Sequence, residues 1–326
     1  MNNSKPPILK DKYIRSVIKL GNSYAMTFPQ DWANQSELKE KTEIFLYPLD
    51  DNTLIVKSRD KDEKKTIFRL NSNEWSPELI RQAIISAFKL NVHEIFIKYY
   101  EDNQEQLYEL LTELRREIIG IDFKNLTENN EFFIYFLLDT SKTTFQEVLT
   151  DLINLFITII KNIIEGIVKN NNNLLLAEMD RKYSLGRRIL ITGLSEYPIS
   201  RGYRNLPIIQ FLGDRVILLY IRDFINEAFN LQNFPQHIIN KYSELLSEIP
   251  KLLIDIMENY NNINLETISK FHGYLLDLRS MLNSIELEDT FEDLEIRYSI
   301  KYFLNSFQNF FDIGITRLIE TEIGMA

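Results

Sequence analysis

The chain has 326 residues, no cysteine and a formal net charge of −10. The absence of cysteine excludes disulfides, iron–sulfur clusters and thiolate zinc sites, and the acidic balance argues against a protein coated with nucleic acid. Hydrophobic residues (44%) are ample for folded cores, the length allows two or three domains, and few glycines and prolines (10 and 9) favour long helices.

Neither a membrane span nor a secretion signal is expected. Four polar or charged residues interrupt the most apolar stretch, 152–168: Asn154, Lys161, Asn162 and Glu165. Its longest unbroken apolar run is too short to cross a bilayer. The opening residues, MNNSKPP, lack the apolar core of a signal peptide. We therefore expect a soluble, cytoplasmic protein without membrane insertion.

Residues 11–58 are predicted to form a small all-β module. Alternating and β-branched residues predict strands at 13–19, 24–28, 42–49 and 53–57, with a short polar helix around 30–35. Gly21, Asn22 and Ser23 supply the first turn, and Asp50-Asp51-Asn52 supplies the second. Four short strands without a disulfide cannot bury a sufficient core, so a second copy of the segment is the expected partner.

This segment resembles a known family of DNA-binding modules. Its order RSVIKLGNSYAMTFPQDW (15–32), followed by LKEKTEIFLY (38–47), is similar to the AbrB/MazE/SpoVT family. The resemblance implies a swapped-hairpin fold, in which two copies interleave their hairpins into one dimeric barrel. It also implies that DNA is a partner and that the protein is a homodimer through this module.

The charge of the first 24 residues agrees with a DNA-binding end. These residues include five lysines and arginines and one aspartate, for a net charge of +4. A basic arm on an acidic body is expected when only one end meets phosphate, although a solvated tail has the same composition. The period-2 repeat of a strand places Arg15 and Lys19 on one face.

Six residues are the predicted DNA contacts. Three basic side chains are expected to contact phosphates or base edges, and three residues at the hairpin tip are expected to add hydrogen bonds. They are Lys12, Arg15 and Lys19, and Asn22, Ser23 and Tyr24 respectively. The alternative is a barrel that only dimerises and whose basic side chains are solvated.

Residues 66–140 are predicted to form a small α/β domain in the order βαβαββ, after a charged linker at 58–65. Ser76 and Pro77 mark the start of its first helix, and Gly120 follows its second. Apolar residues at helical spacing are expected to face the sheet: Leu79, Ile80, Ala83, Ile84, Ala87 and Phe88 in the first helix, and Leu107, Leu110, Leu111, Leu114 and Ile118 in the second. No glycine-rich phosphate loop opens either helix, so nucleotide binding is not expected.

Residues 143–322 are predicted to be entirely α-helical. Six helices are expected, at 144–170, 172–197, 203–230, 236–259, 264–286 and 290–321. Apolar residues repeat at helical spacing on one face of the first helix. Six long antiparallel helices predict two three-helix bundles packed side by side.

An internal repeat supports this pairing. The stretches LPIIQFLGD (206–214) and LNSFQNFFD (304–312) lie 98 residues apart, each in the third helix of a predicted triplet. This arrangement resembles the PhoU family of phosphate-uptake regulators, whose fold is two repeated three-helix bundles. QFLGD (210–214) is the nearest match to the family pattern E-R-I-G-D, and NFFD (309–312) is a fainter copy. The chain joins an AbrB-like module, an α/β segment and such a bundle. In this combination it resembles proteins known from archaea.

The resemblance also raises the question of a metal, because members of the family bind metal clusters through E/D-x3-D pairs. Gln210 and Gln308 stand where a glutamate is expected, and Leu176 lies four residues before Asp180. One aspartate per site makes a poor cage, so neither a metal nor another cofactor is expected. The three remaining aspartates are predicted to make hydrogen bonds between helices: Asp180, Asp214 and Asp312.

No enzyme is predicted. The three histidines are scattered without a paired ligand, and Ser195 lacks the glycine of a nucleophile elbow. Arg201, Tyr203 and Arg204 follow Pro198 and could hold an anion such as phosphate at a helix start. Plain solvation of that turn is the alternative.

Two functions remain. The first is a homodimeric DNA-binding transcriptional regulator of phosphate uptake, whose bundle senses phosphate status or a transporter. The second is an adaptor that does not bind DNA and that contacts a phosphate transporter or sensor kinase through its acidic bundle. A steep salt dependence of DNA affinity marks the first function.

Overall fold

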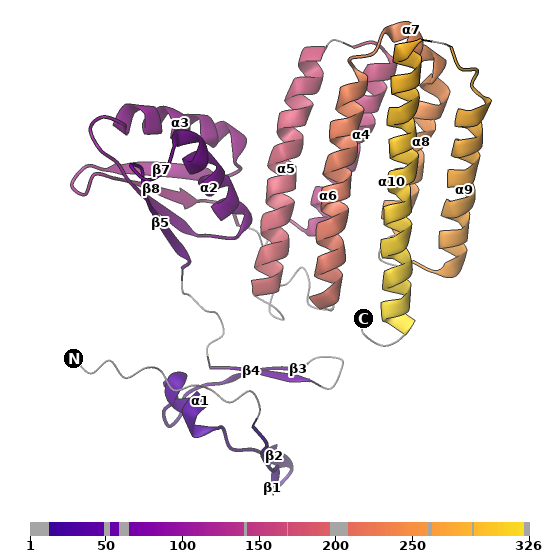
Figure 1. Ribbon diagram of the computed structural model, residues 1–326. Helices are drawn as coiled ribbons and strands as arrows, with labels where there is room; N and C mark the ends of the chain where they lie inside the picture. The colour runs from indigo at the N-terminus through magenta and orange to yellow at the C-terminus, as the bar shows by residue number, and fades with distance from the viewer. Residues whose placement is uncertain are drawn as a thin grey trace. The chain divides into compact units, whose positions relative to one another are not determined.

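A computed structural model describes residues 13–48, 53–58, 65–139, 142–167, 169–195, 208–259, 263–288 and 290–322. Contacts divide the chain into two compact units, residues 1–64 and 65–326. The first unit is a small strand-containing module, and the second holds an α/β segment and a mostly helical region (Figure 1).

The first unit contains two hairpins and a short helix. Strand β1 (Ile18–Leu20) pairs antiparallel with β2 (Ser23–Ala25), and β3 (Phe45–Pro48) pairs antiparallel with β4 (Leu54–Lys57). Helix α1 (Gln30–Gln35) lies between the hairpins in sequence and has the predicted bounds. The strands are shorter than predicted because each has one partner, so pairing stops where that partner ends. The predicted second turn, residues 50–52, lies outside the described residues.

The α/β segment has the predicted order of elements. Its sheet has the strand order β5-β6-β8-β7, in which β5 and β6 are parallel and the other pairs are antiparallel. The strands are β5 (Ile67–Asn71), β6 (Glu94–Lys98), β7 (Ile121–Leu126) and β8 (Glu131–Phe136). Alternate residues of β6, β7 and β8 join one core with two helices, α2 (Pro77–Lys89) and α3 (Gln104–Glu117).

Local signals set the ends of these helices. The Ser76 hydroxyl accepts a hydrogen bond from the backbone N–H of Leu79, and Pro77 occupies the first turn, as predicted. The apolar faces are also as predicted except at Leu79, which is 54% exposed. Leu79 lies in the first turn of α2, on the side away from the buried Ile80 and Ile84.

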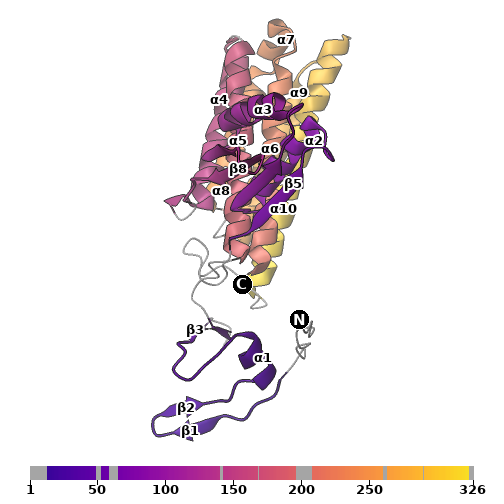
Figure 2. The same ribbon diagram turned by 90° about the vertical axis from the view of Figure 1, so that its left-hand side faces the viewer.

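Seven described helices follow. They are α4 (Phe145–Ile164), α5 (Lys169–Ser195), α6 (Ile208–Leu231), α7 (Gln236–Lys241), α8 (Ser243–Asn259), α9 (Leu265–Ser284) and α10 (Phe291–Glu322). The six long ones run alongside one another (Figure 1, Figure 2). Helices α4, α5 and α6 pack mutually, as do α8, α9 and α10, and contacts of α4 with α8 and of α6 with α10 join the triplets.

The two triplets share a single hydrophobic core. Phe156 of α4, Phe224 of α6 and Phe303 of α10 form a mutual aromatic cluster with ring centroids 5.4 to 6.0 Å apart, and all three are fully buried. Phe307 extends the cluster, 5.1 Å from Phe224. Aromatic pairs at these separations add to the free energy gained from burial.

Gly186 of α5 permits close helix packing at this core. A Cβ at this position would lie 3.0 Å from a side-chain carbon of Leu218 on α6 and 3.2 Å from one of Val148 on α4. Both distances are shorter than most contacts of a real Cβ, so a side chain at this position would require Leu218 and Val148 to move.

The predicted helix at 236–259 is two helices, because the chain breaks at Tyr242. The buried Tyr242 hydroxyl donates a 2.8 Å hydrogen bond to Asp293, and Lys241 donates one of 2.9 Å to the same carboxylate. Asp293 is fully buried near the start of α10 and also accepts from the backbone N–H of Glu288. This network fixes the α7–α8 corner to the N-terminus of α10, where a carboxylate is electrostatically favoured.

A second buried ion pair joins the triplets. Arg317 of α10 donates to the carboxylate of Asp214 on α6, and both side chains are more than nine-tenths buried. Arg317 also donates to the backbone carbonyl of Gln210 at 3.4 Å. Asp214 therefore makes the predicted contact between helices, with Arg317 of the other triplet.

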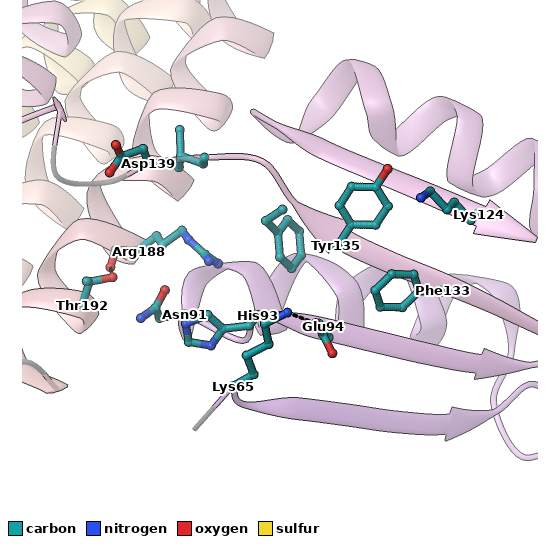
Figure 3. Close-up of a pocket in the computed structure, with 12 residues that line it drawn as sticks. Lys65, Asn91, His93, Glu94, Lys124, Phe133, Tyr135, Asp139, Arg188 and Thr192 are labelled. Atoms are coloured by element: carbon teal, nitrogen blue, oxygen red, sulfur yellow. Dashed lines mark hydrogen bonds and ion pairs between the residues drawn. The ribbon is translucent and has the colours of Figure 1, made fainter. Parts of the chain in front are cut away.

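Arg188 attaches α5 to the α/β segment (Figure 3). Its guanidinium donates to the backbone carbonyls of Phe88 (2.9 Å) and Val92 (3.3 Å), at the C-terminal end of α2. It also lies about 5 Å from the rings of Phe88 and Phe136. Burial lowers the pKa of Arg188 to about 10, so the group remains charged at neutral pH and favours the negative end of the α2 dipole.

Within the described part of the chain, no helix combines the length and the hydrophobicity that a membrane span requires.

The Asp214–Arg317 pair yields the first prediction. Asp214→Ala is expected to lower the free energy of unfolding by about 3–5 kcal/mol, because it leaves the Arg317 guanidinium buried without its carboxylate. The double variant Asp214→Leu/Arg317→Met is expected to recover most of this loss. Urea unfolding followed by circular dichroism measures both, and a double variant no more stable than Asp214→Ala would contradict the account.

Asp293 yields a pH-dependent prediction. Burial raises the pKa of its carboxyl, but hydrogen bonds from Lys241, Glu288 and Tyr242 outweigh burial and lower it. A lowered folded-state pKa stabilises the fold above the unfolded value, near 3.9, and this contribution is lost as pH falls through the folded value. Thermal melts of Asp293→Asn should therefore show a lower Tm at pH 7 and a smaller further loss below about pH 4 than the wild type. Equal pH slopes would refute this.

Candidate nucleic-acid interface

The tip of the first hairpin carries four of the six predicted DNA contacts. Lys19 and Tyr24 face each other across the β1–β2 ladder, and Ser23 faces Leu20. Gly21 and Asn22 form the two-residue turn, with Gly21 at a φ of 60°. Glycine with positive φ at the first turn position is typical of a type II′ hairpin, whose twist matches that of its strands. The sequence therefore folds into a narrow ribbon that ends in polar groups.

These side chains are exposed. Tyr24 is 73% exposed, and Lys19, Asn22 and Ser23 are exposed as well. A two-stranded ribbon of this kind is narrow enough to enter the major groove of DNA. Its cation, amide and hydroxyls can contact phosphate oxygens or base edges.

The structure does not place the other two predicted contacts, Arg15 and Lys12, at the hairpin tip. Arg15 lies before β1 rather than in it, so the structure does not place it on a strand face with Lys19. It is exposed, and its guanidinium donates to the backbone carbonyl of Ile14 at 3.0 Å and lies 5.8 Å from the Tyr13 ring. Lys12 lies outside the described residues.

Helix α1 follows the hairpin and is anchored by an aromatic pair. The rings of Phe28 and Trp32 lie 5.1 Å apart across the turn at Pro29, which precedes the first helical residue. At the other end, Glu37 adopts a φ of 53°, and the N–H of Leu38 bonds the carbonyl of Ala33, as in a Schellman motif.

The first unit lacks a core of its own, because none of its described residues is buried. Large apolar side chains are instead exposed along its strands and their flanks: Ile14, Val17, Ile18, Leu20, Tyr24, Met26, Leu46 and Leu54. An isolated two-stranded hairpin is at best marginally stable in water, and contiguous exposed apolar groups mark an association surface. Sequence reasoning predicted the need for a partner but did not identify these residues.

The aspartates considered as metal ligands lie apart. Asp180 is 4.0 Å from Arg222, beyond hydrogen-bond distance, and Asp214 pairs with Arg317. Asp312 is exposed and accepts a hydrogen bond from Gln308 of its own helix, and among the described residues it has no hydrogen bond to another helix. Among the described residues no group of three or more candidate ligands could hold a metal ion.

Two of the side chains considered for catalysis make hydrogen bonds with backbone groups. The Nδ1 atom of His93 accepts a hydrogen bond from the backbone N–H of Thr66. Ser195 donates to the backbone carbonyl of Thr192. The cluster predicted for an anion lies outside the described residues: Arg201, Tyr203 and Arg204.

A cavity of about 460 Å³ lies between the sheet and α5 (Figure 3). Several polar groups around it have partners: Lys65 pairs with Glu94 at 2.6 Å, and the Tyr135 hydroxyl donates to Asp122 at 2.8 Å. Arg188 is engaged at the end of α2.

The comparison with known families addresses the first unit. Residues 17–64 match the family described as antidote-toxin recognition MazE, bacterial antitoxin. The match confirms the predicted MazE/AbrB-like module at the N-terminus of the chain. No curated protein and no solved structure matches the chain.

The exposed apolar set predicts that the module holds two chains together. Ile18→Asp introduces a charge into this set and should convert a dimer into a monomer in sedimentation velocity. Leu265→Asp, at a 70% exposed position on α9, is the matched control and should leave the dimer intact. A monomeric wild type, or a dimer that survives Ile18→Asp, would contradict the prediction.

Proposed function

We propose that the protein is a homodimeric transcriptional regulator without enzymatic activity, whose N-terminal module binds DNA and whose helical unit senses phosphate status. The match of residues 17–64 to the MazE family carries the DNA-binding part, because such modules typically bind DNA and dimerise. The exposed polar hairpin tip supplies groups suited to the contacts.

The proposed dimer is a swapped-hairpin barrel. Two copies would interleave their hairpins and bury the apolar side chains exposed in one copy. The same arrangement would present two hairpin tips, each with Lys19, Asn22, Ser23 and Tyr24. Two tips double the number of phosphate contacts, and Arg15 would add a cation beside each.

The assignment of the helical region to phosphate sensing is supported by its architecture. Two packed triplets, α4–α5–α6 and α8–α9–α10, match the layout that the PhoU resemblance implies. The Gln/Asp pairs of the repeat, Gln210/Asp214 and Gln308/Asp312, fall in the third helix of each triplet, although Asp214 is buried and Asp312 is exposed. The environments of the two copies therefore differ, as in a repeat whose halves have diverged.

Two alternatives involve protein partners. An adaptor would use the acidic helices to contact a phosphate transporter or sensor kinase without binding DNA. The description of the matching family also names recognition of a toxin, which makes a small toxin protein a second candidate partner. The adaptor would leave the hairpin without a role in DNA binding, whereas a toxin partner would not exclude one.

A DNA titration tests the proposal. The wild type should bind a duplex from its own upstream region with an affinity that falls steeply between about 50 mM and about 200 mM salt. Arg15→Ala/Lys19→Ala should weaken binding at least tenfold and lower the log–log salt slope by about 0.9 for each phosphate that is no longer neutralised.

The matched control removes the same charges elsewhere. Arg116→Ala/Lys301→Ala also deletes one arginine and one lysine, both exposed in the second unit, and should bind like the wild type. No binding by the wild type at low salt would overturn the proposal and favour a protein partner. An equal loss in both double variants would show that net charge, rather than the hairpin, controls affinity.

A further inference from the structure

Three cationic side chains from three helices surround one tyrosine ring. Lys89 ends α2, Arg187 lies on α5 and Arg222 lies on α6. The Lys89 Nζ is 5.4 Å from the ring centroid of Tyr183, and the Cζ atoms of Arg187 and Arg222 are 6.0 and 4.8 Å from it. Tyr183 is buried, so the ring is a fixed platform.

Carboxylates do not balance these charges within the described residues. The nearest ion pair is that of Arg222 with Asp180, at 4.0 Å, and the Asp180 side chain is 64% exposed. Asp223 follows Arg222 in sequence, and burial raises the pKa of its carboxyl while the charge of Arg222 lowers it. Two further cations of α5 are paired elsewhere, Arg181 with Glu178 and Lys182 with Asp151.

The arrangement is costly without a ligand. The Nε atoms of Arg187 and Arg222 are buried and have no hydrogen-bond partner among the described residues, although the Arg222 Nε lies 4.0 Å from the Asp180 carboxylate. Burial lowers the pKa of Lys89, and the charges of Arg222 and Arg187 lower it further, against the opposing effects of Tyr183 and Asp180. Like charges brought together in partly buried surroundings disfavour one another unless an anion lies among them.

We propose that Lys89, Arg187, Arg222 and the Tyr183 hydroxyl form a binding site for a multivalent oxyanion, namely inorganic phosphate or the phosphoryl group of a small metabolite. Guanidinium groups donate paired N–H bonds to such oxygens, and an ammonium adds a compact charge. The Tyr183 hydroxyl accepts a 3.1 Å hydrogen bond from Arg187 and has its own proton to donate to the anion.

The position of the site gives the anion a structural effect. Lys89 belongs to the α/β segment, whereas Arg187 and Arg222 belong to the helical region. The anion would therefore bridge the two parts beside Arg188, which already joins α5 to α2. The site would be the sensing site of the proposed regulator, and to that extent the inference rests on the proposed function.

Calorimetric titration of the full chain with inorganic phosphate tests the site. The wild type should show saturable binding at constant ionic strength, with a rise in Tm on adding phosphate and none on adding chloride. Arg187→Gln/Arg222→Gln should weaken binding at least tenfold. Arg69→Gln/Arg116→Gln, which removes two exposed arginines of the α/β segment, should bind like the wild type.

A sugar phosphate is titrated in parallel with inorganic phosphate. The ligand that binds more tightly shows whether the site takes free phosphate or a phosphorylated metabolite. Absence of binding of both ligands to the wild type, or equal binding by Arg187→Gln/Arg222→Gln, would overturn the site. If that variant unfolds, Lys89→Gln provides the same comparison from the end of α2. DNA binding is measured on the same variants. If they bind DNA like the wild type, the DNA-binding proposal holds whether or not the anion site exists.

Discussion

The central constraint on this molecule is that its N-terminal unit buries none of its described residues. Two short hairpins and one helical turn and a half cannot offset their loss of conformational entropy without apolar burial. The apolar side chains needed for a core are present, but they lie on the surface of a single copy. A second copy that covers them would at the same time pair two hairpin tips, so stability and DNA recognition would depend on one association.

The second unit, in contrast, has a hydrophobic core of its own. Its two helix triplets share one aromatic core, and buried polar contacts fix their relative positions at Asp214–Arg317 and at Asp293. Arg188 ties the α/β segment to α5 with its charge intact. The anion proposed where α2, α5 and α6 meet would act on this packed unit, in which elements respond by discrete shifts rather than by gradual deformation.

Features set by neighbouring residues were predictable from the sequence, whereas those set by distant partners were not. The bounds of α1 and the Ser76 cap follow from residues within a few positions, and the MazE-like order of residues 15–47 identified the module. The partner of Tyr242 at the helix break is Asp293, 51 residues away, and the partner of Asp214 lies 103 residues away. The cluster around Tyr183 joins helices that only the fold brings together, so no local pattern could reveal it.

A probe at the hairpin tip tests most directly whether the hairpin contacts DNA. The chain contains no cysteine, so Ser23→Cys and Ser247→Cys each provide a single attachment point for a photoreactive label, one at the tip and one at an exposed position of α8. In the protein–DNA complex, we expect efficient crosslinking to DNA from position 23 and background crosslinking from position 247. Crosslinking from position 247 alone, or from neither position in a complex shown to be intact, would contradict the claim that the hairpin contacts DNA.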